Sequence, residues 1–137
     1  MAYWLFKSEP GSWSWDDQVR RDNKGQEWDG VRNFQAQSNM RKMKQGDRGF
    51  FYHTGDEKAV VGIVEVSGEI HPESKDPEWE CVDIVAVEPL PRPVSLAEIK
   101  SDPALKDMVL VRNARLSVQP VTDAEWKLVL KRAGTKG

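Results

Sequence analysis

The spacing of apolar residues along the chain switches between the two-residue repeat of strands and the longer repeat of helices. Residues 2–7 are mostly aromatic and aliphatic and a Pro-Gly pair follows them, which predicts a first strand. Ser14 and Asp17 have the spacing of a helix capping box, so we expect a helix from there to about residue 22. Apolar side chains recur at helical intervals over residues 33–43 and predict a second helix.

The middle of the chain has the two-residue repeat of strands. Residues 48–54 and 59–70 flank a four-residue connection that contains glycine, which predicts a β-hairpin. Residues 79–88 alternate in the same way and predict a third strand, with both faces partly apolar as in a curled sheet covered by helices. Three alternate prolines follow at positions 89–93. Because proline removes a backbone donor from a sheet, we expect a stiff connector there.

The last third of the chain alternates between helix and strand. Serine and threonine caps predict helices at residues 96–100 and 123–132, residues 116–121 predict a last strand, and we expect residues 134–137 to fray. Together these elements predict an α+β fold, a small mixed β-barrel of five or six strands with short helices at the rim. The mouth of such a barrel is where a small ligand usually enters.

Length and composition fit a single domain that comprises residues 1–137. The chain has no signal-like stretch and no apolar run near the roughly 20 residues that span a bilayer, so we expect a cytoplasmic protein without membrane contact. Cys81 is the only cysteine, so we expect neither a disulfide nor a thiolate metal site. The sequence predicts no metal and no cofactor, and we take the chain to act as a monomer.

The net charge of −2 argues against a protein whose affinity rests on neutralising many backbone phosphates. The charge is unevenly distributed, however. Residues 32–48 hold five basic side chains against one aspartate, and residues 65–88 hold eight carboxylates against one lysine. One basic and one acidic surface would orient a polyanion without holding it tightly. The alternative is a pair of ordinary solvated surfaces.

The six tryptophans are spread along the chain instead of lying on one helical stripe. Indole rings bury a large area with little loss of rotamer entropy, and they offer a π-face to a base or a cation. The sequence has no phosphate loop, no metal-ligand cluster and no nucleophile-plus-base arrangement, so we assign no catalytic residue. These features favour a protein that binds something flat.

Five strings resemble the EVE domain family, in the same order and over nearly the whole chain. They are WLFKSEP at 4–10, WDGVRNFQA at 28–36, FYHT at 51–54, VGIVEV at 61–66 and RLSVQP at 115–120. The resemblance implies a PUA-like barrel, related to YTH domains, that accepts an extruded modified base, with modified cytosines in DNA as the best-supported class. The family often has serine where Thr54 stands and Ser-Arg-Leu-Ser where this chain has Asn113-Ala114-Arg115-Leu116-Ser117. The changes at Asn113 and Ala114 affect which modification is preferred.

The resemblance implies a site for a flipped base. Such a base needs an aromatic wall, polar groups at its edge and cations for the flanking phosphates. For the base pocket we expect Trp28, Trp79, Ser8, Asn33, Tyr52, His53, Thr54 and Ser117. For the phosphates we expect Lys7, Arg32 and Arg115. Several assignments have a structural alternative: Asn33 as a helix cap, His53 as a hydrogen-bonded structural histidine, and Trp28 as a core residue. Asp83 is expected to pair with Arg115, with the amine of a cytosine as the alternative partner.

Three functions follow from these observations. The first is a non-catalytic reader that binds a 5-substituted cytosine flipped out of DNA, so the expected partner is nucleic acid with a modified base, DNA before RNA. The second is a PUA-like module that binds modified RNA. The third is a small hydrolase or deaminase in which Lys7, Glu9 and His53 act on a nucleoside-like substrate.

Overall fold

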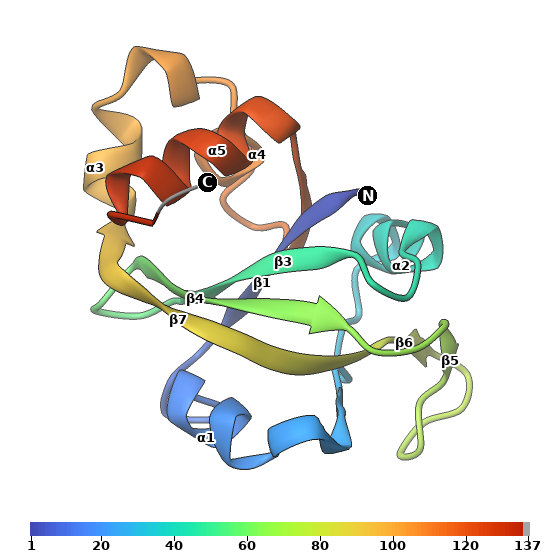
Figure 1. Cartoon of the computed structure of the whole chain (residues 1–137). Helices are drawn as coiled ribbons and strands as arrows, with labels where there is room; N and C mark the ends of the chain where they lie inside the picture. Colours follow the sequence, from blue (N-terminus) through green and yellow to red (C-terminus); the bar gives the residue numbers. More distant parts are fainter. Residues whose placement is uncertain (136–137) are drawn as a thin grey trace.

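A curled six-stranded sheet forms the centre of the molecule, and helices cover both of its faces (Figure 1). This computed structural model describes residues 1–135. The strands follow the order β2-β7-β4-β3-β1-β8, with β2 and β8 as the edges, so the sheet is a half-barrel. The α+β class and the small mixed sheet expected from the sequence are confirmed. The strands of the main sheet are β1 (Tyr3–Ser8), β2 (Gln26–Glu27), β3 (Arg48–His53), β4 (Ala59–Val66), β7 (Asp83–Ser95) and β8 (Val118–Val121).

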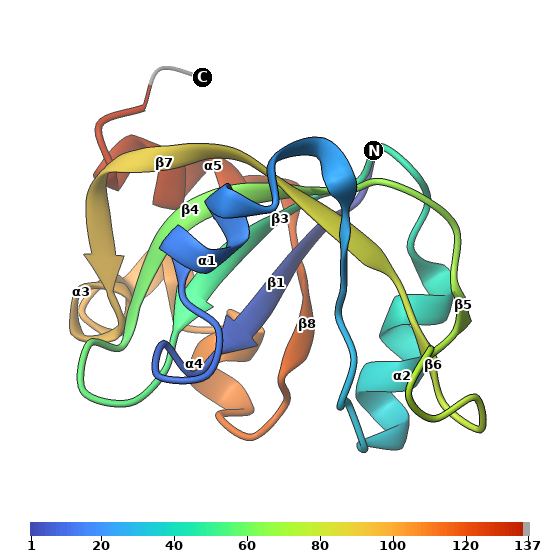
Figure 2. The ribbon, with the colours of Figure 1, turned by 90° about the horizontal axis from the view of Figure 1, so that it is seen from below.

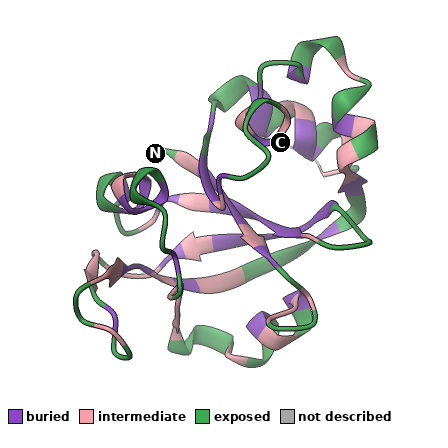
Figure 3. Ribbon diagram, turned by 180° about the vertical axis from the view of Figure 1, so that it is seen from behind, coloured by how far each residue is buried: buried purple, intermediate pink, exposed green. Residues whose placement is uncertain are grey.

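The sheet separates two hydrophobic cores, which is why so many of its residues are buried (Figure 3). Trp4 and Phe6 of β1 belong to one core, together with the inner face of the helix at Phe34–Lys42. Leu5, between them, belongs to the other core, which contains Trp126 of the C-terminal helix. Neighbouring residues of β1 enter opposite cores because strand side chains alternate between the two faces.

Strand β1 lies inside the sheet, between β3 and β8. It runs parallel to β3, with Lys7 opposite Tyr52 and Ser8 opposite His53, and antiparallel to β8. The chain leaves the sheet at Ser8, so the side chains of Lys7 and Ser8 lie at the end of the central strands.

The predicted hairpin is present, since β3 and β4 pair antiparallel across residues 54–58. The prediction of a stiff connector at residues 89–93 is wrong, because β7 continues through Pro89, Pro91 and Pro93 to Ser95. Over this stretch β7 pairs with β4 on one side only, because β2 reaches no further than Asp83 and Ile84. The prolines are therefore on an exposed edge, where a missing N–H group costs no sheet hydrogen bond.

The helices are short, and most begin at side-chain caps. They are α1 (Trp15–Arg20), α2 (Phe34–Lys42), α3 (Leu96–Lys100), α4 (Val109–Arg112) and α5 (Asp123–Arg132), with 3-10 turns η1 (Asp22–Lys24) and η2 (Pro103–Leu105). Capping boxes start α1 and α5, as the sequence predicts, η2 begins at the Asp102 side-chain cap, and α4 has no side-chain cap. In the segment expected to fray, the Thr135 amide donates to the Leu130 carbonyl at 2.9 Å and closes α5, and residues 136–137 lie outside the described residues. Over residues 1–135 no helix has the length and apolar character needed to cross a bilayer.

Ion pairs join the basic segment to the acidic segment, so the two are not separate charged surfaces. Helix α2 lies beside the two-stranded ribbon β5 (His71–Pro72) and β6 (Glu80–Cys81) (Figure 2). Arg41 bonds Glu80 at 2.7 Å, and Arg32 bonds Glu73 at 2.9 Å. Because these arginines face carboxylates of the acidic segment, much of the basic charge is not free to attract phosphates.

Candidate functional site

A cleft of about 570 Å³ opens where β1 ends. Its volume lies in the range of small-molecule sites, roughly 300–1,000 Å³. The cleft lies between the end of β1, the loop before α1, the segment from β2 to α2, and one residue each from the β5–β6 loop and the approach to β8. The lining residues are Lys7, Ser8, Glu9, Ser12, Trp13, Gln26, Glu27, Trp28, Asp29, Gly30, Val31, Arg32, Lys75 and Ser117. Of the residues predicted from the sequence, Lys7, Ser8, Trp28, Arg32 and Ser117 line it.

Trp28 serves as both a wall of the cleft and a core residue. Its backbone amide donates to the Val82 carbonyl at 2.8 Å, which continues the short pairing of β2 with β7. Its ring packs edge-on against Phe6 and Phe51, with centroids 5.5 and 5.7 Å away, and the residue is only 7% exposed. Aromatic neighbours at such angles hold the indole in a fixed orientation. The two expectations for Trp28, pocket wall and core, are thus compatible.

Trp13 is a lining residue that the sequence predictions did not include. Its Nε1 donates to Oε1 of the buried Gln18 at 2.9 Å, and the Gln18 amide in turn donates to the Ile84 carbonyl. The Ser8 hydroxyl donates to the Trp13 carbonyl and holds the backbone beside the end of β1. Trp13 directly precedes Ser14, the cap of α1, and this position between a strand end and a helix cap was the signal available in the sequence.

Lys7 is half-buried at the rim. Its ammonium group donates to the Ala114 carbonyl and lies 6.0 Å from the centroid of the Tyr52 ring. Burial lowers the pKa of Lys7 below its usual value. The backbone amide of Lys7 also donates to the Ser117 carbonyl at 2.9 Å, so the lysine ties β1 to the segment before β8.

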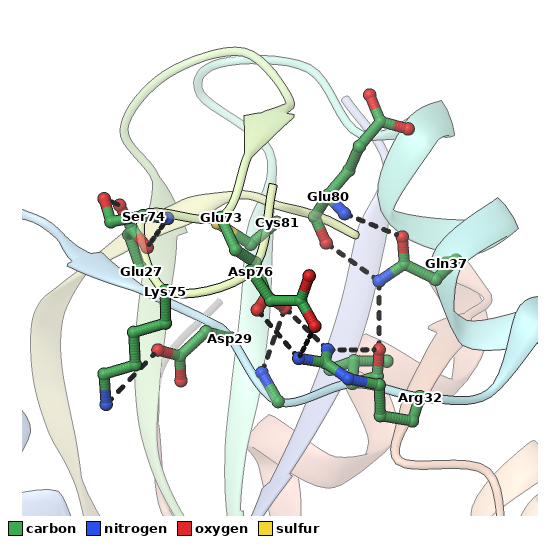
Figure 4. Close-up of polar contacts among 12 residues, drawn as sticks. Glu27, Asp29, Arg32, Gln37, Glu73, Ser74, Lys75, Asp76, Glu80 and Cys81 are labelled. Carbon is green, nitrogen blue, oxygen red and sulfur yellow. Dashed lines mark hydrogen bonds and ion pairs between the residues drawn. The ribbon is translucent and has the colours of Figure 1, made fainter. Parts of the chain in front are cut away.

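Arg32 is committed to an acidic partner, as Figure 4 shows. Its guanidinium makes two bonds to Glu73, at 2.9 and 3.1 Å, and Asp76 lies 3.7 Å away. The Glu73 side chain also accepts from the Gly30 amide, and Arg32 holds the pKa of Glu73 below its usual value. The pair connects the segment after Trp28 to the β5–β6 loop. Arg32 therefore shapes the cleft more than it offers a free cation to a phosphate.

Three predicted pocket residues on and after β3 have structural roles instead. Tyr52 points to the opposite face of the sheet, into the core that contains Phe50. His53 is buried: its Nε2 accepts from the Trp15 amide at 2.9 Å and its Nδ1 lies 2.6 Å from Glu57. The Thr54 amide donates to the Ser8 carbonyl at 2.8 Å, which extends the pairing of β1 with β3. None of these side chains lines the cleft.

The remaining predicted residues lie outside the cleft. Trp79 stacks on the exposed Phe34 at 5.6 Å and borders a separate hollow, so it is not the second wall. Asn33 caps α2 by accepting from the Ala36 amide at 2.9 Å. Arg115 is exposed near the rim and is not a lining residue. The expected pair of Asp83 and Arg115 is also wrong, because Asp83 bonds His71 at 2.9 Å.

A half-barrel with an aromatic cleft at the end of its central strands is the architecture of the PUA-like class. Within that class, the chain belongs to the EVE domain family, whose model matches residues 2–132. It is 34% identical to human thymocyte nuclear protein 1, over 94% of this chain and 72% of that protein. Its identity to thymocyte nuclear protein 1 of Gallus gallus is also 34%, over 94% of this chain and 67% of that protein.

Solved structures agree with this assignment. A crystal structure of an Agrobacterium tumefaciens protein has a TM-score of 0.96 at 52% identity and covers 98% of this chain and 94% of that chain. The human THYN1 protein in complex with DNA that contains 5-methylcytosine has a TM-score of 0.90 at 31% identity, with both chains fully covered. A YTH domain of Zygosaccharomyces rouxii MRB1 in complex with N6-methyladenosine RNA is 17% identical, with a TM-score of 0.59 over 96% of this chain and 86% of that chain. That last likeness concerns the fold alone.

Proposed function

We propose that this protein is a non-catalytic reader that takes a 5-substituted cytosine out of duplex DNA and holds it in the cleft. The observation that carries the proposal is the cleft itself, about 570 Å³ in volume, with Trp28 fixed edge-on in its wall and Trp13 at its rim. The human THYN1 protein supports it, since a chain with the same fold and 31% identity was solved with DNA containing 5-methylcytosine.

The lining offers the groups that an extruded cytosine requires. Trp13 and Trp28 supply aromatic surface, and the carboxylates of Glu9 and Asp29 are acceptors of the kind that the exocyclic amine of cytosine seeks. Stacking contributes roughly 1–3 kcal/mol per base, and unstacking costs a few kcal/mol. The two free energies nearly cancel, so the contacts of the modification decide whether the base is bound in the cleft. A buried methyl group contributes about 0.8 kcal/mol, which corresponds to a preference of about fourfold.

The test is a titration with three duplexes of one sequence whose central base is cytosine, 5-methylcytosine or 5-hydroxymethylcytosine, followed by tryptophan emission. We expect a modified duplex to bind more tightly and to quench emission, because Trp13 and Trp28 line the cleft. Three identical isotherms would remove DNA-modification reading as the function. An RNA hairpin with the same modified base is the fourth arm, and tighter binding to it would establish RNA as the partner.

Lys7 is the cation best placed to meet a phosphate beside the extruded base, since it lies at the rim. We expect Lys7→Met to weaken binding to modified and plain duplexes alike and to lower the slope of log Kd against log salt by about 0.9. Salt titrations by fluorescence anisotropy measure this slope. Lys106→Met is the matched control, because Lys106 is exposed and does not line the cleft. Equal slopes for Lys7→Met and wild type would remove Lys7 from the phosphate contacts.

The absence of turnover is part of the proposal. Lys7 and Glu9 line the cleft, but His53 does not, and both of its ring nitrogens already have partners. A general base has to reach the proton that it removes, within roughly 3 Å. We therefore expect modified nucleosides and oligonucleotides to be recovered unchanged after prolonged incubation. Product formation that is abolished in a folded Lys7→Met variant would reverse this conclusion.

A further inference from the structure

Four side chains with metal-binding donor atoms converge beside the cleft, and they come from two adjacent antiparallel strand pairs. Glu27 is opposite Asp83 in the pairing of β2 with β7, and His71 is opposite Cys81 in the pairing of β5 with β6. Cys81 and Asp83 are two residues apart, so the pleat of the chain turns both toward the same side. The backbone therefore brings one imidazole, one thiol and two carboxylates together.

The distances suit a small cation. One donor atom from each of the four residues lies within 4.8 Å of all the others. Nε2 of His71 is 2.9 Å from Oδ1 of Asp83 and 3.9 Å from Sγ of Cys81. Zinc bonds of about 2.0–2.3 Å in a tetrahedron place the donor atoms roughly 3.3–3.8 Å apart. Shifts of about 1 Å or less would complete that arrangement.

The neighbours of the cluster orient its donor atoms inward. Nδ1 of His71 lies 2.7 Å from the Pro72 carbonyl and donates to it, and Nε2 faces the cluster, where it donates to Asp83 until a metal replaces its proton. A backbone carbonyl in this position is a typical partner of a metal-binding histidine. The Ser74 amide donates to the Glu27 carboxylate at 3.1 Å, and the Ser74 hydroxyl donates to it as well. The Cys81 thiol is fully buried behind these groups.

Access to the cluster comes from a second hollow, of about 330 Å³, which is lined by Glu27 and Asp83 among others. The surroundings are rich in negative charge: burial and the neighbouring carboxylates, Glu27 first, raise the pKa of the Cys81 thiol to about 12. A dication reverses this electrostatic balance and allows a coordinating thiol to ionise. Without a metal, the hydrogen bond between His71 and Asp83 connects the β5–β6 pair to the β2–β7 pair.

We propose that Glu27, His71, Cys81 and Asp83 form a tetrahedral binding site for a transition-metal dication of the zinc class. The donor set decides the class, because imidazole and thiolate favour zinc and its neighbours, whereas magnesium and calcium require oxygen ligands. The expectation of no metal site followed from a single cysteine, but here one histidine and two carboxylates supply the other ligands. The proposal is independent of what the cleft binds.

The test uses the full chain freed of metal by a chelator, with ZnCl₂ for calorimetry and CoCl₂ for absorption spectroscopy. We expect one equivalent of either ion to bind, with visible bands typical of tetrahedral cobalt and a near-ultraviolet band from thiolate-to-cobalt charge transfer. MgCl₂ should produce no binding heat. A metal that binds only the folded state should also raise the melting temperature as its concentration rises.

Variants separate this site from adventitious binding. Cys81→Ser should lose the charge-transfer band and weaken zinc binding at least about tenfold, and His71→Asn should abolish the zinc-dependent rise in melting temperature. Glu78→Gln, an exposed residue of the same loop outside the cluster, should bind as wild type. Circular dichroism shows which variants are folded, so a Cys81→Ser chain that fails to fold leaves His71→Asn to decide. The proposal is overturned by absence of stoichiometric binding, by an octahedral cobalt spectrum, or by folded variants that bind as wild type.

Discussion

Individual residues at the cleft serve the fold and the ligand to different degrees. Trp28 is 7% exposed and is wedged between Phe6 and Phe51, so replacing it removes core packing together with any ligand contact. Trp13 is half-buried and its indole nitrogen is held by one side chain, Gln18. Removal of Trp13 therefore separates recognition from stability better than removal of Trp28 does.

We expect Trp13→Ala to weaken binding of a modified duplex by about tenfold, because stacking contributes roughly 1–3 kcal/mol per base. The free energy of unfolding should fall by about 1–3 kcal/mol, because the buried Gln18 loses the donor to its Oε1. Duplex titration and urea unfolding of the same preparation measure both effects. Unchanged affinity in a stable variant would place the base away from Trp13.

Trp126→Ala is the matched contrast. Trp126 is 5% exposed and stacks between Tyr3 and Phe50, with centroids 4.2 and 4.1 Å away, in the core on the far side of the sheet. Its truncation should lower the free energy of unfolding by about 3–5 kcal/mol and leave the affinity of the folded protein unchanged. Loss of affinity at temperatures where the variant is folded would contradict the separation of the two cores.

His53 is expected to act on stability alone. His53→Ala removes the acceptor of the buried Trp15 amide, and an unsatisfied buried donor costs about 1–3 kcal/mol. Denaturant unfolding should show this loss, while the affinity of the folded variant for a modified duplex stays near that of wild type. A variant of wild-type stability that no longer binds the duplex would return His53 to the pocket.

At the scale of elements, α1 depends on a glycine of the sheet. A Cβ atom built on Gly62 of β4 would lie 2.5 Å from the Trp15 ring, so α1 can rest on the strand only where the strand has no side chain. We expect Gly62→Ala to cost about 1–3 kcal/mol, measured by urea unfolding, because the ring and helix must move away. Gly68→Ala is the control: its Cβ meets no heavy atom within 4 Å, and its effect should stay within about 0.5 kcal/mol. Equal effects would disprove the close approach.

The elements that the sequence predicts well are those with local signals. The caps Ser14 and Thr122 bond the backbone three residues ahead, so the start of α1 and the bounds of α5 follow from a few neighbouring residues. The strand through Pro89–Ser95 has no such signal. Whether proline is tolerated there depends on which strands lie alongside, and pairing between β4 and β7 is a long-range property.

The same limit applies to the candidate site. Lys7, Ser8 and Trp28 were predictable because each lies where a strand ends or a turn begins, and such places meet at the rim of a sheet. Tyr52 was misplaced because alternation tells which residues of a strand share a face, not which face meets the cleft. That information comes from long-range packing, which sets Phe50 and Tyr52 against the core that contains Trp126. Trp13 was missed because its position depends on Gln18, a contact made only after α1 folds.

At the scale of the whole molecule, a charge network joins β7, α3 and α5. Glu98 accepts from Arg92 at 2.8 and 3.1 Å and from Arg132 at 3.0 Å, and Arg132 also bonds Asp102. The hydrogen bonds from Arg92, followed by those from Arg132, lower the pKa of Glu98 to about 2. A lowered carboxyl pKa stabilises the fold at every pH above the unfolded value of 4.5, and this contribution disappears as the pH falls toward 2.

We therefore expect Glu98→Gln to be less stable than wild type at neutral pH by about 1 kcal/mol, a modest value because water screens the partly exposed network. The difference should shrink as the pH is lowered from about 5 to about 2, because the carboxyl of unfolded wild type, with a pKa of 4.5, takes up a proton before that of the folded protein does. Urea unfolding of both proteins across this range measures the difference. A difference that stays constant with pH would show that the pairing contributes nothing through the charge of Glu98.

Strand β1 forms its antiparallel pairs with β8, whose residues follow it by more than a hundred positions: Tyr3 faces Val121 and Phe6 faces Val118. During translation the first strand emerges long before its last neighbour exists. One side of β1 is then an open row of amides and carbonyls flanked by Trp4 and Phe6, which is a template for stray pairing with other chains. Nascent molecules thus remain vulnerable to aggregation until residues 118–121 have left the ribosome, and fragments that stop earlier should depend on chaperones to stay soluble.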